Sequence, residues 1–217
     1  MANKKDKINT MDLVKIGFVT IAFILLILFL LAYPTSSLST TSNNSPSTTS
    51  NSTLLIEDIL PKSTTQFVLS SSVLKENELM PTKYTRDGDN LSLPLNWSGI
   101  PNETKSLVII MYDPDAPSGV FYHWILYNIP KNVNSIPEGI QKSPITPYGY
   151  QGINSYNTLG YDGPSPPKGS THRYIFLVLA LDTELALGPN TYYSQLLNST
   201  KGHIIAYAEL TCLYRKD

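Results

Sequence analysis

The segment Met111-Tyr-Asp-Pro-Asp-Ala-Pro-Ser-Gly-Val-Phe-Tyr-His123 joins two apolar runs through a connection that contains two aspartates and two prolines. The preceding run, 106–112, is short and rich in β-branched residues, which favours a strand over a helix. The prolines end that strand because they fix φ and lack an amide donor. A second apolar run, 123–129, follows. We therefore expect Asp113 and His123, which flank the connection, to converge on one pocket.

Short apolar runs separated by turn residues continue along the chain from Gln66. This spacing is typical of an all-β domain, and the 14 tyrosines of the chain agree with a composition that favours strands. One segment, 192–197, is expected to form a short helix. The expected strands are 67–69, 91–97, 107–112, 124–129, 174–181 and 204–213.

The N-terminal part of the chain differs in composition from this domain. Residues 1–15 carry four lysines, and residues 16–33 are uncharged and almost wholly apolar. A run of this length favours an uncleaved transmembrane anchor over a cleaved signal peptide or a buried core helix. The lysines place residues 1–15 in the cytoplasm and the domain, residues 66–217, outside the cell membrane. Between them, residues 34–65 begin with a Ser-, Thr- and Asn-rich tract and are expected to form a linker.

Several Asn-x-Ser/Thr patterns agree with an exterior, glycosylated domain. Such short patterns also arise by chance in Asn- and Ser-rich sequence, so they support the exterior location only collectively. The candidate acceptors are Asn43, Asn51, Asn90, Asn96, Asn102 and Asn198.

Composition excludes some classes of function. Charged residues make up 15% of the chain and the net charge is −1, so there is no basic field for nucleic acid. The single cysteine, Cys212, excludes a disulfide framework within the chain and a cysteine-rich metal site. We interpret it as a buried thiol, with an intermolecular disulfide as the alternative. No cofactor or metal is implied.

A second polar segment, Gly163-Pro-Ser-Pro-Pro-Lys-Gly-Ser-Thr-His-Arg-Tyr174, leads into the apolar run 175–181. Residues two apart in a strand share a face, so His172 and Tyr174 are expected to point one way and Arg173 the other. Polar groups at the start of a buried face need partners, which either a pocket or the neighbouring backbone can supply. The same two alternatives hold for Asp113, because Asp-Pro-Asp is also a common turn. His203 is interpreted as structural or exposed.

These segments resemble the signatures of the phosphatidylethanolamine-binding protein family, in particular its bacterial and archaeal, Raf-kinase-inhibitor-like branch. The resemblance covers about Gln66 to Lys216 and is carried by 113–117, 123–124 and 166–174, with 81–92, 95–101 and 208–211 in the same order. It implies a mainly β, antiparallel β-sandwich with few short helices and a small anion pocket. Ser165 stands where many relatives have glycine. The resemblance places Asp113, His123, Pro166, His172 and Tyr174 around the pocket and Gly163 and Pro167 in its wall.

The resemblance implies binding of phosphoryl or carboxylate groups, including phospholipid headgroups, by a regulatory protein without catalytic residues. An exterior, tethered copy is expected to be a candidate inhibitor of serine proteases. The alternative is an ester or phosphoester hydrolase, with or without a metal ion, that uses Asp113, His123, His172 and Tyr174. A third interpretation is a structural surface component whose pocket is vestigial.

Overall fold

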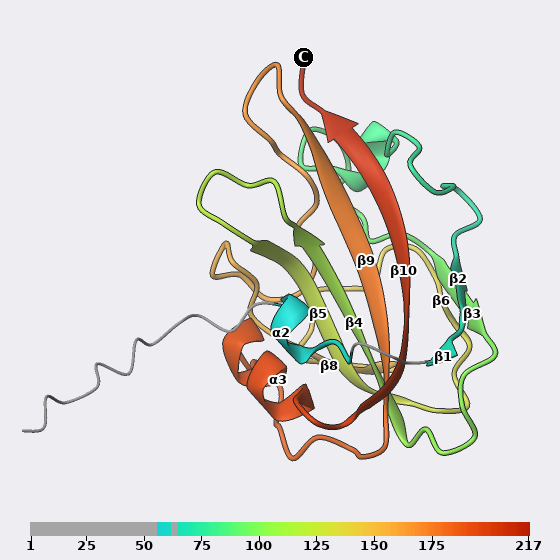
Figure 1. The fold of residues 1–217 in the computed structure, drawn as a ribbon. Coiled ribbons are helices and arrows are strands. Elements are labelled where there is room, and N and C mark those ends of the chain that lie inside the picture. The colour runs from blue at the N-terminus through green and yellow to red at the C-terminus, as the bar shows by residue number, and fades with distance from the viewer. Residues whose placement is uncertain (1–55, 62–64) are drawn as a thin grey trace, which may run out of the picture. The chain divides into compact units, whose positions relative to one another are not determined.

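The computed structural model describes residues 56–61 and 65–217, which form a mainly β fold with few helices (Figure 1). In chain order the elements are α2 (Ile56–Ile59), β1 (Thr65–Gln66), β2 (Val68–Ser70), the 3₁₀ turn η1 (Thr82–Tyr84), β3 (Leu95–Ser98), β4 (Ser106–Asp113), β5 (Phe121–Pro130), β6 (Ser135–Ile136), β7 (Ile145–Thr146), β8 (Gly149–Gln151), β9 (Thr171–Leu181), α3 (Tyr193–Thr200) and β10 (Ile204–Arg215).

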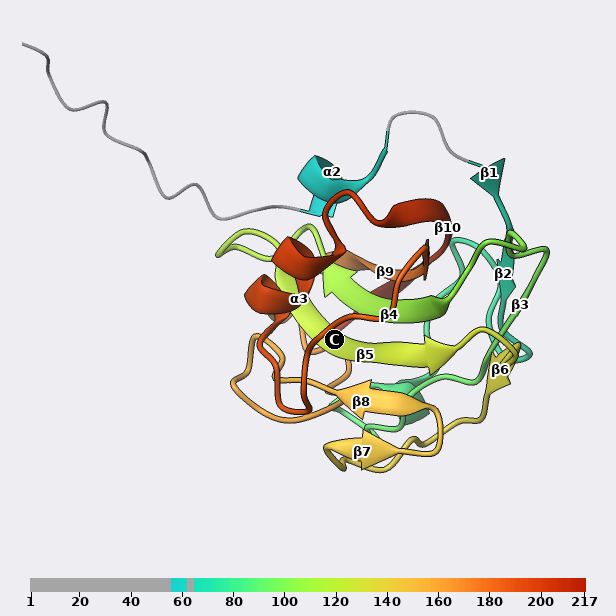
Figure 2. The same cartoon turned by 90° about the horizontal axis from the view of Figure 1, so that it is seen from below.

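Two sheets make up the fold. The larger has seven strands in the order β1-β10-β9-β4-β5-β8-β7, and the smaller has three in the order β2-β3-β6. Neighbouring strands pair antiparallel except for β1, which lies parallel to β10. In Figure 2 the smaller sheet and α3 lie on opposite sides of the central strands. The antiparallel two-sheet architecture that the resemblance implies is confirmed, with β1 as the exception.

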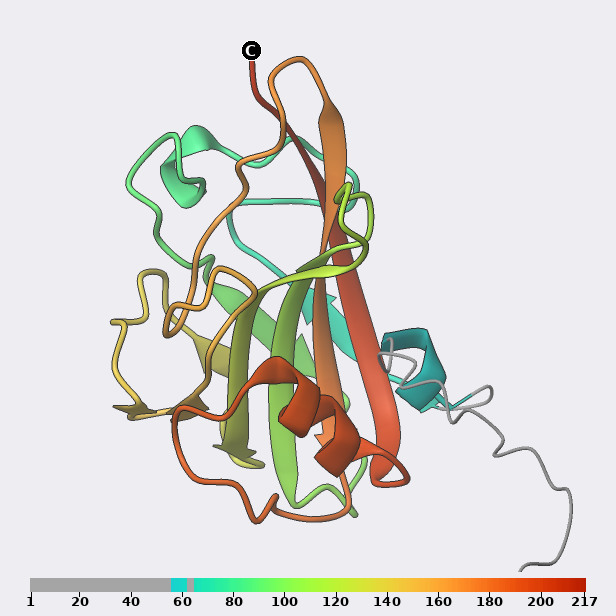
Figure 3. The same ribbon diagram turned by 90° about the vertical axis from the view of Figure 1, so that its left-hand side faces the viewer.

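The central strands are buried on both faces. All of β4 is buried, and β9 is buried from Phe176 onward. One face packs against the smaller sheet through residues such as Met111, Trp124 and Leu95. The other face packs against the helices, where Leu196 of α3 joins the same cluster as Ile110 (Figure 3). This double burial explains why these strands are continuous apolar runs rather than alternating ones.

Each expected strand is present in part or in whole. The four strands that were not expected (β1, β6, β7 and β8) are only two or three residues long, too short to show a period-2 pattern. The helix expected at 192–197 is α3, which continues to Thr200.

The predicted cytoplasmic segment 1–15 and membrane anchor 16–33 lie outside the described residues. Within the described ranges, no helix has the length and apolar character needed to cross a bilayer. The predicted linker 34–65 is described only at 56–61 and 65. There Ile56–Ile59 form α2, whose two isoleucines are buried in the cluster shared with α3. The C-terminal end of the predicted linker therefore packs against the domain, because Ile56 and Ile59 lie on one face of α2.

The candidate glycosylation sites differ in exposure. Asn43 and Asn51 lie outside the described residues, whereas Asn96, Asn102 and Asn198 are exposed and stay predictions. Asn90 is half-buried, and its amide nitrogen donates to the Asp162 carboxylate. Glycosylation of Asn90 also stays a prediction, at a side chain that already takes part in this internal hydrogen bond.

Candidate functional site

One small cavity lies where β4 ends and where β5 and β9 begin. Because β4 pairs antiparallel with both β5 and β9, its last residue, Asp113, lies opposite Phe121 at the start of β5, and its side chain reaches His172 near the start of β9. The cavity encloses about 180 Å³. It is lined by Asp113, Ala116, Pro117, Ser118, Phe121, His123, Tyr156, Ser165, Pro166, Pro167, His172 and Tyr174. Six of the seven residues proposed from the sequence therefore share one cavity, although they come from three separate segments.

Asp113 and His172 form a buried pair across β4 and β9. Asp113 Oδ2 lies 2.8 Å from His172 Nδ1, and both side chains are more than nine-tenths buried. The other carboxylate oxygen accepts a hydrogen bond from the Asp115 amide at 2.8 Å. The Asp-Pro-Asp segment is thus a turn and also part of the cavity, so both alternatives left open by the sequence hold.

Arg173 points away from the cavity, as the strand alternation predicts. Its guanidinium and amide bind the Asp115 carboxylate, with Nη2 to Oδ1 at 2.6 Å. This exposed ion pair holds the β4–β5 connection against β9. The positive charge of Arg173 is thereby paired with the carboxylate of Asp115. His203 also lies elsewhere, as an exposed partner of Asp182.

His123 is almost fully buried and is held by backbone. Its Nδ1 lies 2.7 Å from the carbonyl oxygen of Asp162, and the Asp162 amide donates in turn to the His123 carbonyl at 3.1 Å. Burial lowers the pKa of His123 to about 4 and outweighs the opposing effect of nearby carbonyls and carboxylates. His123 is therefore neutral at physiological pH.

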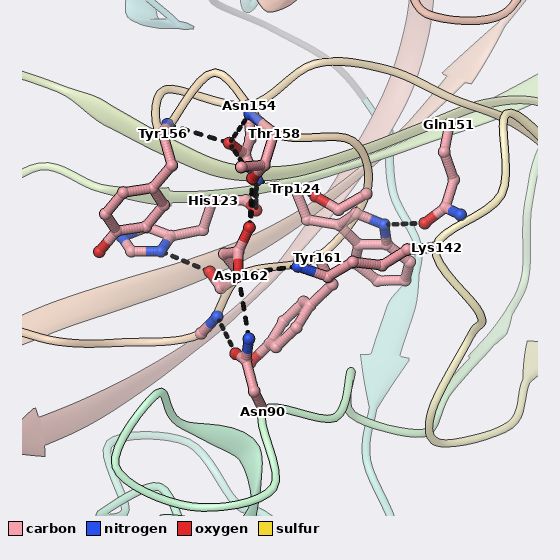
Figure 4. A network of polar contacts seen from close by, with 12 residues as sticks. Asn90, His123, Trp124, Lys142, Gln151, Asn154, Tyr156, Thr158, Tyr161 and Asp162 are labelled. Atoms are coloured by element: carbon pink, nitrogen blue, oxygen red, sulfur yellow. Dashed lines mark hydrogen bonds and ion pairs between the residues drawn. The ribbon is translucent and has the colours of Figure 1, made fainter.

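Asp162 is the centre of a polar network that the sequence did not reveal (Figure 4). Its carboxylate accepts hydrogen bonds from Lys142 Nζ at 2.8 Å and from Asn90 and Asn154 at 3.0 Å each, and it also bonds to Thr158. Burial raises the pKa of Asp162, but these partners together outweigh it and lower the pKa to about 2. The network ties three segments of the chain to the backbone that holds His123.

Aromatic rings form the remaining wall. Tyr174 stands 5.3 Å from His123, ring centre to ring centre, and burial followed by the charge of Asp113 raises the pKa of its hydroxyl well above the usual value. Tyr174 is thus a permanent hydrogen-bond donor. Phe121 and Tyr156, which sequence reasoning missed, pack edge to face at 4.6 Å. Arg86 lies 4.2 Å from the centre of the Tyr156 ring.

Gly163 is the one proposed residue that does not line the cavity. It packs against the backbone of η1, where a Cβ atom would lie 2.3 Å from the Tyr84 carbonyl oxygen. Its amide donates to Asn90 Oδ1 at 2.7 Å. The expectation that Gly163 forms pocket wall is therefore corrected: it permits close backbone approach behind the cavity.

We expect Gly163→Ala to lower the free energy of unfolding by about 1–3 kcal/mol, because the new methyl group must displace backbone. Gly188→Ala is the matched control, since no atom beyond its chain neighbours lies within 4 Å of the place that its methyl group would take. Urea denaturation of both variants measures the effect. Equal stability of the two variants would contradict the close-approach role.

The family model for phosphatidylethanolamine-binding proteins matches residues 70–215. The chain belongs to this family. A UPF0098 protein of Methanothermobacter thermautotrophicus is 43% identical over 149 residues, which cover 68% of this chain and 98% of that protein.

Two solved structures of the phosphatidylethanolamine-binding protein family are similar to this chain. A putative family homologue from Chlamydia trachomatis is 38% identical with a TM-score of 0.64, covering 70% of this chain and 99% of that chain. Escherichia coli YbcL, described as a member of the mammalian family, is 32% identical with the same TM-score, covering 70% of this chain and 100% of that one. Family membership supports a binding or regulatory protein for small ligands such as phospholipid headgroups.

Proposed function

We propose that this domain is a non-enzymatic binding protein whose cavity takes a phosphoryl or carboxylate group. The observation that carries the proposal is the convergence of Asp113, His123, His172 and Tyr174 on one cavity. Histidine rings and a protonated tyrosine hydroxyl are suitable hydrogen-bond partners for such groups. The same cavity on a tethered exterior domain would act as a headgroup sensor, and a serine protease partner stays a prediction from the resemblance.

The size of the cavity limits the ligand to a small group. At about 180 Å³ it is smaller than typical small-molecule sites of about 300–1,000 Å³. A headgroup or a small oxyanion fits this volume, whereas the rest of a lipid must stay outside.

The hydrolase alternative finds less support in the geometry. Asp113, His172 and Ser170 are aligned like a nucleophilic triad, with Ser170 Oγ 3.3 Å from His172 Nε2. However, the Ser170 hydroxyl donates to the Pro167 carbonyl at 2.6 Å. The Ser170 amide bonds to the same carbonyl and the Gly169 amide to that of Lys216, so neither is free to stabilise an oxyanion. A screen with ester and phosphoester substrates tests the proposal that the domain is not a hydrolase. Turnover that Ser170→Ala abolishes would overturn that proposal.

The metal-dependent version of this alternative needs a shared ligand set. Among the residues that the structure describes, no three His, Cys, Asp or Glu side chains are placed to hold one metal ion. Asp113, His123 and His172 thus line the same cavity without forming such a set.

We expect His172→Ala and His123→Ala each to weaken binding of inorganic phosphate by about 1.5–3 kcal/mol, roughly 10- to 150-fold. Each variant removes a ring that lines the cavity. Isothermal titration calorimetry at constant ionic strength measures the change. His203→Ala, an exposed histidine paired with Asp182, is the matched control and should bind as the wild type does. Unchanged binding heats in both cavity variants would contradict the proposal.

A further inference from the structure

The tautomer of His123 is fixed by its partner. A carbonyl oxygen only accepts hydrogen bonds, so the contact of His123 Nδ1 with the Asp162 carbonyl requires the proton on Nδ1. The neutral ring then carries a lone pair on Nε2. No residue in the described part of the chain hydrogen-bonds to Nε2, and the ring forms cavity wall. His123 therefore offers the cavity an acceptor.

The Asp162 network keeps His123 in this state. Asp162 holds the ring through its carbonyl and the strand through its amide, and its own side chain is anchored by four partners (Figure 4). Asn154 adds a hydrogen bond to the His123 carbonyl at 3.3 Å. Turning Nδ1 toward the cavity would break its hydrogen bond to the Asp162 carbonyl.

The lining of the cavity carries no lysine or arginine, within the residues described. Three basic side chains lie near this lining without belonging to it: Arg173 binds Asp115, Lys142 binds Asp162, and Arg86 lies over the Tyr156 ring. The lining does contain a carboxylate, Asp113, which is hydrogen-bonded to His172 Nδ1. The titratable groups that face His123 are Asp113 on β4, His172 and Tyr174 on β9, and Tyr156 and Asp162 on the 152–170 connection, with Arg86 behind Tyr156.

These contacts decide which charge state of a phosphoryl group fits. A doubly charged group would face the Asp113 carboxylate and the His123 lone pair with no proton between them, which is unfavourable in a buried site. A group that keeps one proton can donate it to His123 Nε2. Its unprotonated oxygens then accept from the Tyr174 hydroxyl.

We propose that the cavity selects the singly charged, proton-bearing form of a phosphomonoester, with the P–OH hydrogen donated to His123 Nε2. This inference rests on the proposed function and narrows it. Phosphodiesters and carboxylates carry no such proton at neutral pH, so both are disfavoured. Soluble phosphomonoesters and monoester lipid headgroups share the required chemistry.

Calorimetry with ethyl phosphate between pH 5.5 and 8.5 tests the proposal. The second pKa of a phosphomonoester is about 6, so the fraction of proton-bearing ligand falls tenfold per pH unit above it. We expect the dissociation constant to rise with that slope above about pH 7. Titrations in buffers of different ionisation enthalpy should show one proton taken up per ligand near pH 8. Diethyl phosphate, a monoanion without a proton, should bind at least about tenfold more weakly at pH 5.5.

Two substitutions at His123 distinguish the effect of losing the Nε2 acceptor from the effect of losing the ring. Asparagine keeps a donor near Nδ1 and lacks the acceptor, so His123→Asn should bring the affinities for ethyl and diethyl phosphate close together. Glutamine places an amide oxygen near the Nε2 position, so His123→Gln should restore part of the preference. His203→Asn is the matched control on an exposed histidine and should keep the wild-type pH profile.

Vesicles identify the source of the ligand. Competition by phosphatidylcholine vesicles that contain phosphatidic acid would support the proposal with a lipid source, and ethyl phosphate binding without such competition would support it with a soluble source. Equal competition by phosphatidylethanolamine, a diester, would overturn it. So would an ethyl phosphate affinity that is independent of pH. Failure of both phosphate esters to bind at any pH would overturn the proposed function as well, which distinguishes the two failures.

Discussion

Asp162→Ala is expected to lower the free energy of unfolding by about 3–5 kcal/mol, the range for breaking a buried charged network. The Asp162 side chain is 8% exposed and satisfies four donors. Without it, the amides of Asn90 and Asn154 lose a charged acceptor in a buried site, and each unsatisfied donor costs about 1–3 kcal/mol. Lys142 is 43% exposed, so water compensates part of its loss.

Urea denaturation at pH 7 measures this effect. The matched control is Asp182→Ala, which breaks an exposed pair with His203 and should change stability by less than about 1 kcal/mol. The same Asp162 variant should also broaden or shift the ring resonances of His123, because the carbonyl that holds Nδ1 loses its anchor. A loss of stability as small as that of the control would show that the network does not anchor the site.

Acidification from pH 7 to pH 4 is expected to cost the domain about 3 kcal/mol of stability through His123 alone. Burial lowers the pKa of His123 to about 4 in the folded state, against 6.5 for the unfolded ring. Between these values the unfolded chain binds a proton that the folded chain does not, so the free energy of unfolding falls as pH falls. The contribution is fully present above pH 6.5 and is lost as pH falls toward 4.

Chemical denaturation of the wild type and of His123→Asn, at several pH values from 7 to 4, isolates this effect. The variant lacks the titrating ring, so the stability gap between the two proteins should shrink by about 3 kcal/mol over this range. The Asp162 carboxylate titrates lower, between its ordinary value of 3.8 and about 2, and so contributes little above pH 4. A stability gap that does not vary with pH would contradict a buried, neutral His123.

Local sequence patterns were sufficient for the main strands. Pro114 directly follows the last residue of β4, and Pro130 is the last residue of β5, because a proline nitrogen cannot donate to a sheet. The short strands β6, β7 and β8 have no such pattern, since they form only where a longer neighbour, or one another, offers pairing groups. The position of His172 and Tyr174 on one face likewise followed from strand alternation.

The family resemblance predicted more of the cavity residues than the local sequence patterns did. It did not predict the residues that pack behind the cavity. Tyr156 and Phe121 lie in the wall without any local signal of that role. Asp162 precedes Gly163 in a turn-rich segment, where an aspartate is ordinary. Its partners at Asn90 and Lys142 are distant in sequence, so no pattern along the chain joins them.

The sequence by itself determined a β-rich domain and which side chains end its central strands. Those properties depend on hydrophobic period and on proline geometry, which act over a few residues. Only the tertiary structure decided that Asp113 and His172 pair across two strands, that Gly163 packs closely against the Tyr84 backbone, and that burial lowers the pKa of His123. Protonation depends on burial and on which atoms meet in space, and both arise only when distant segments pack together.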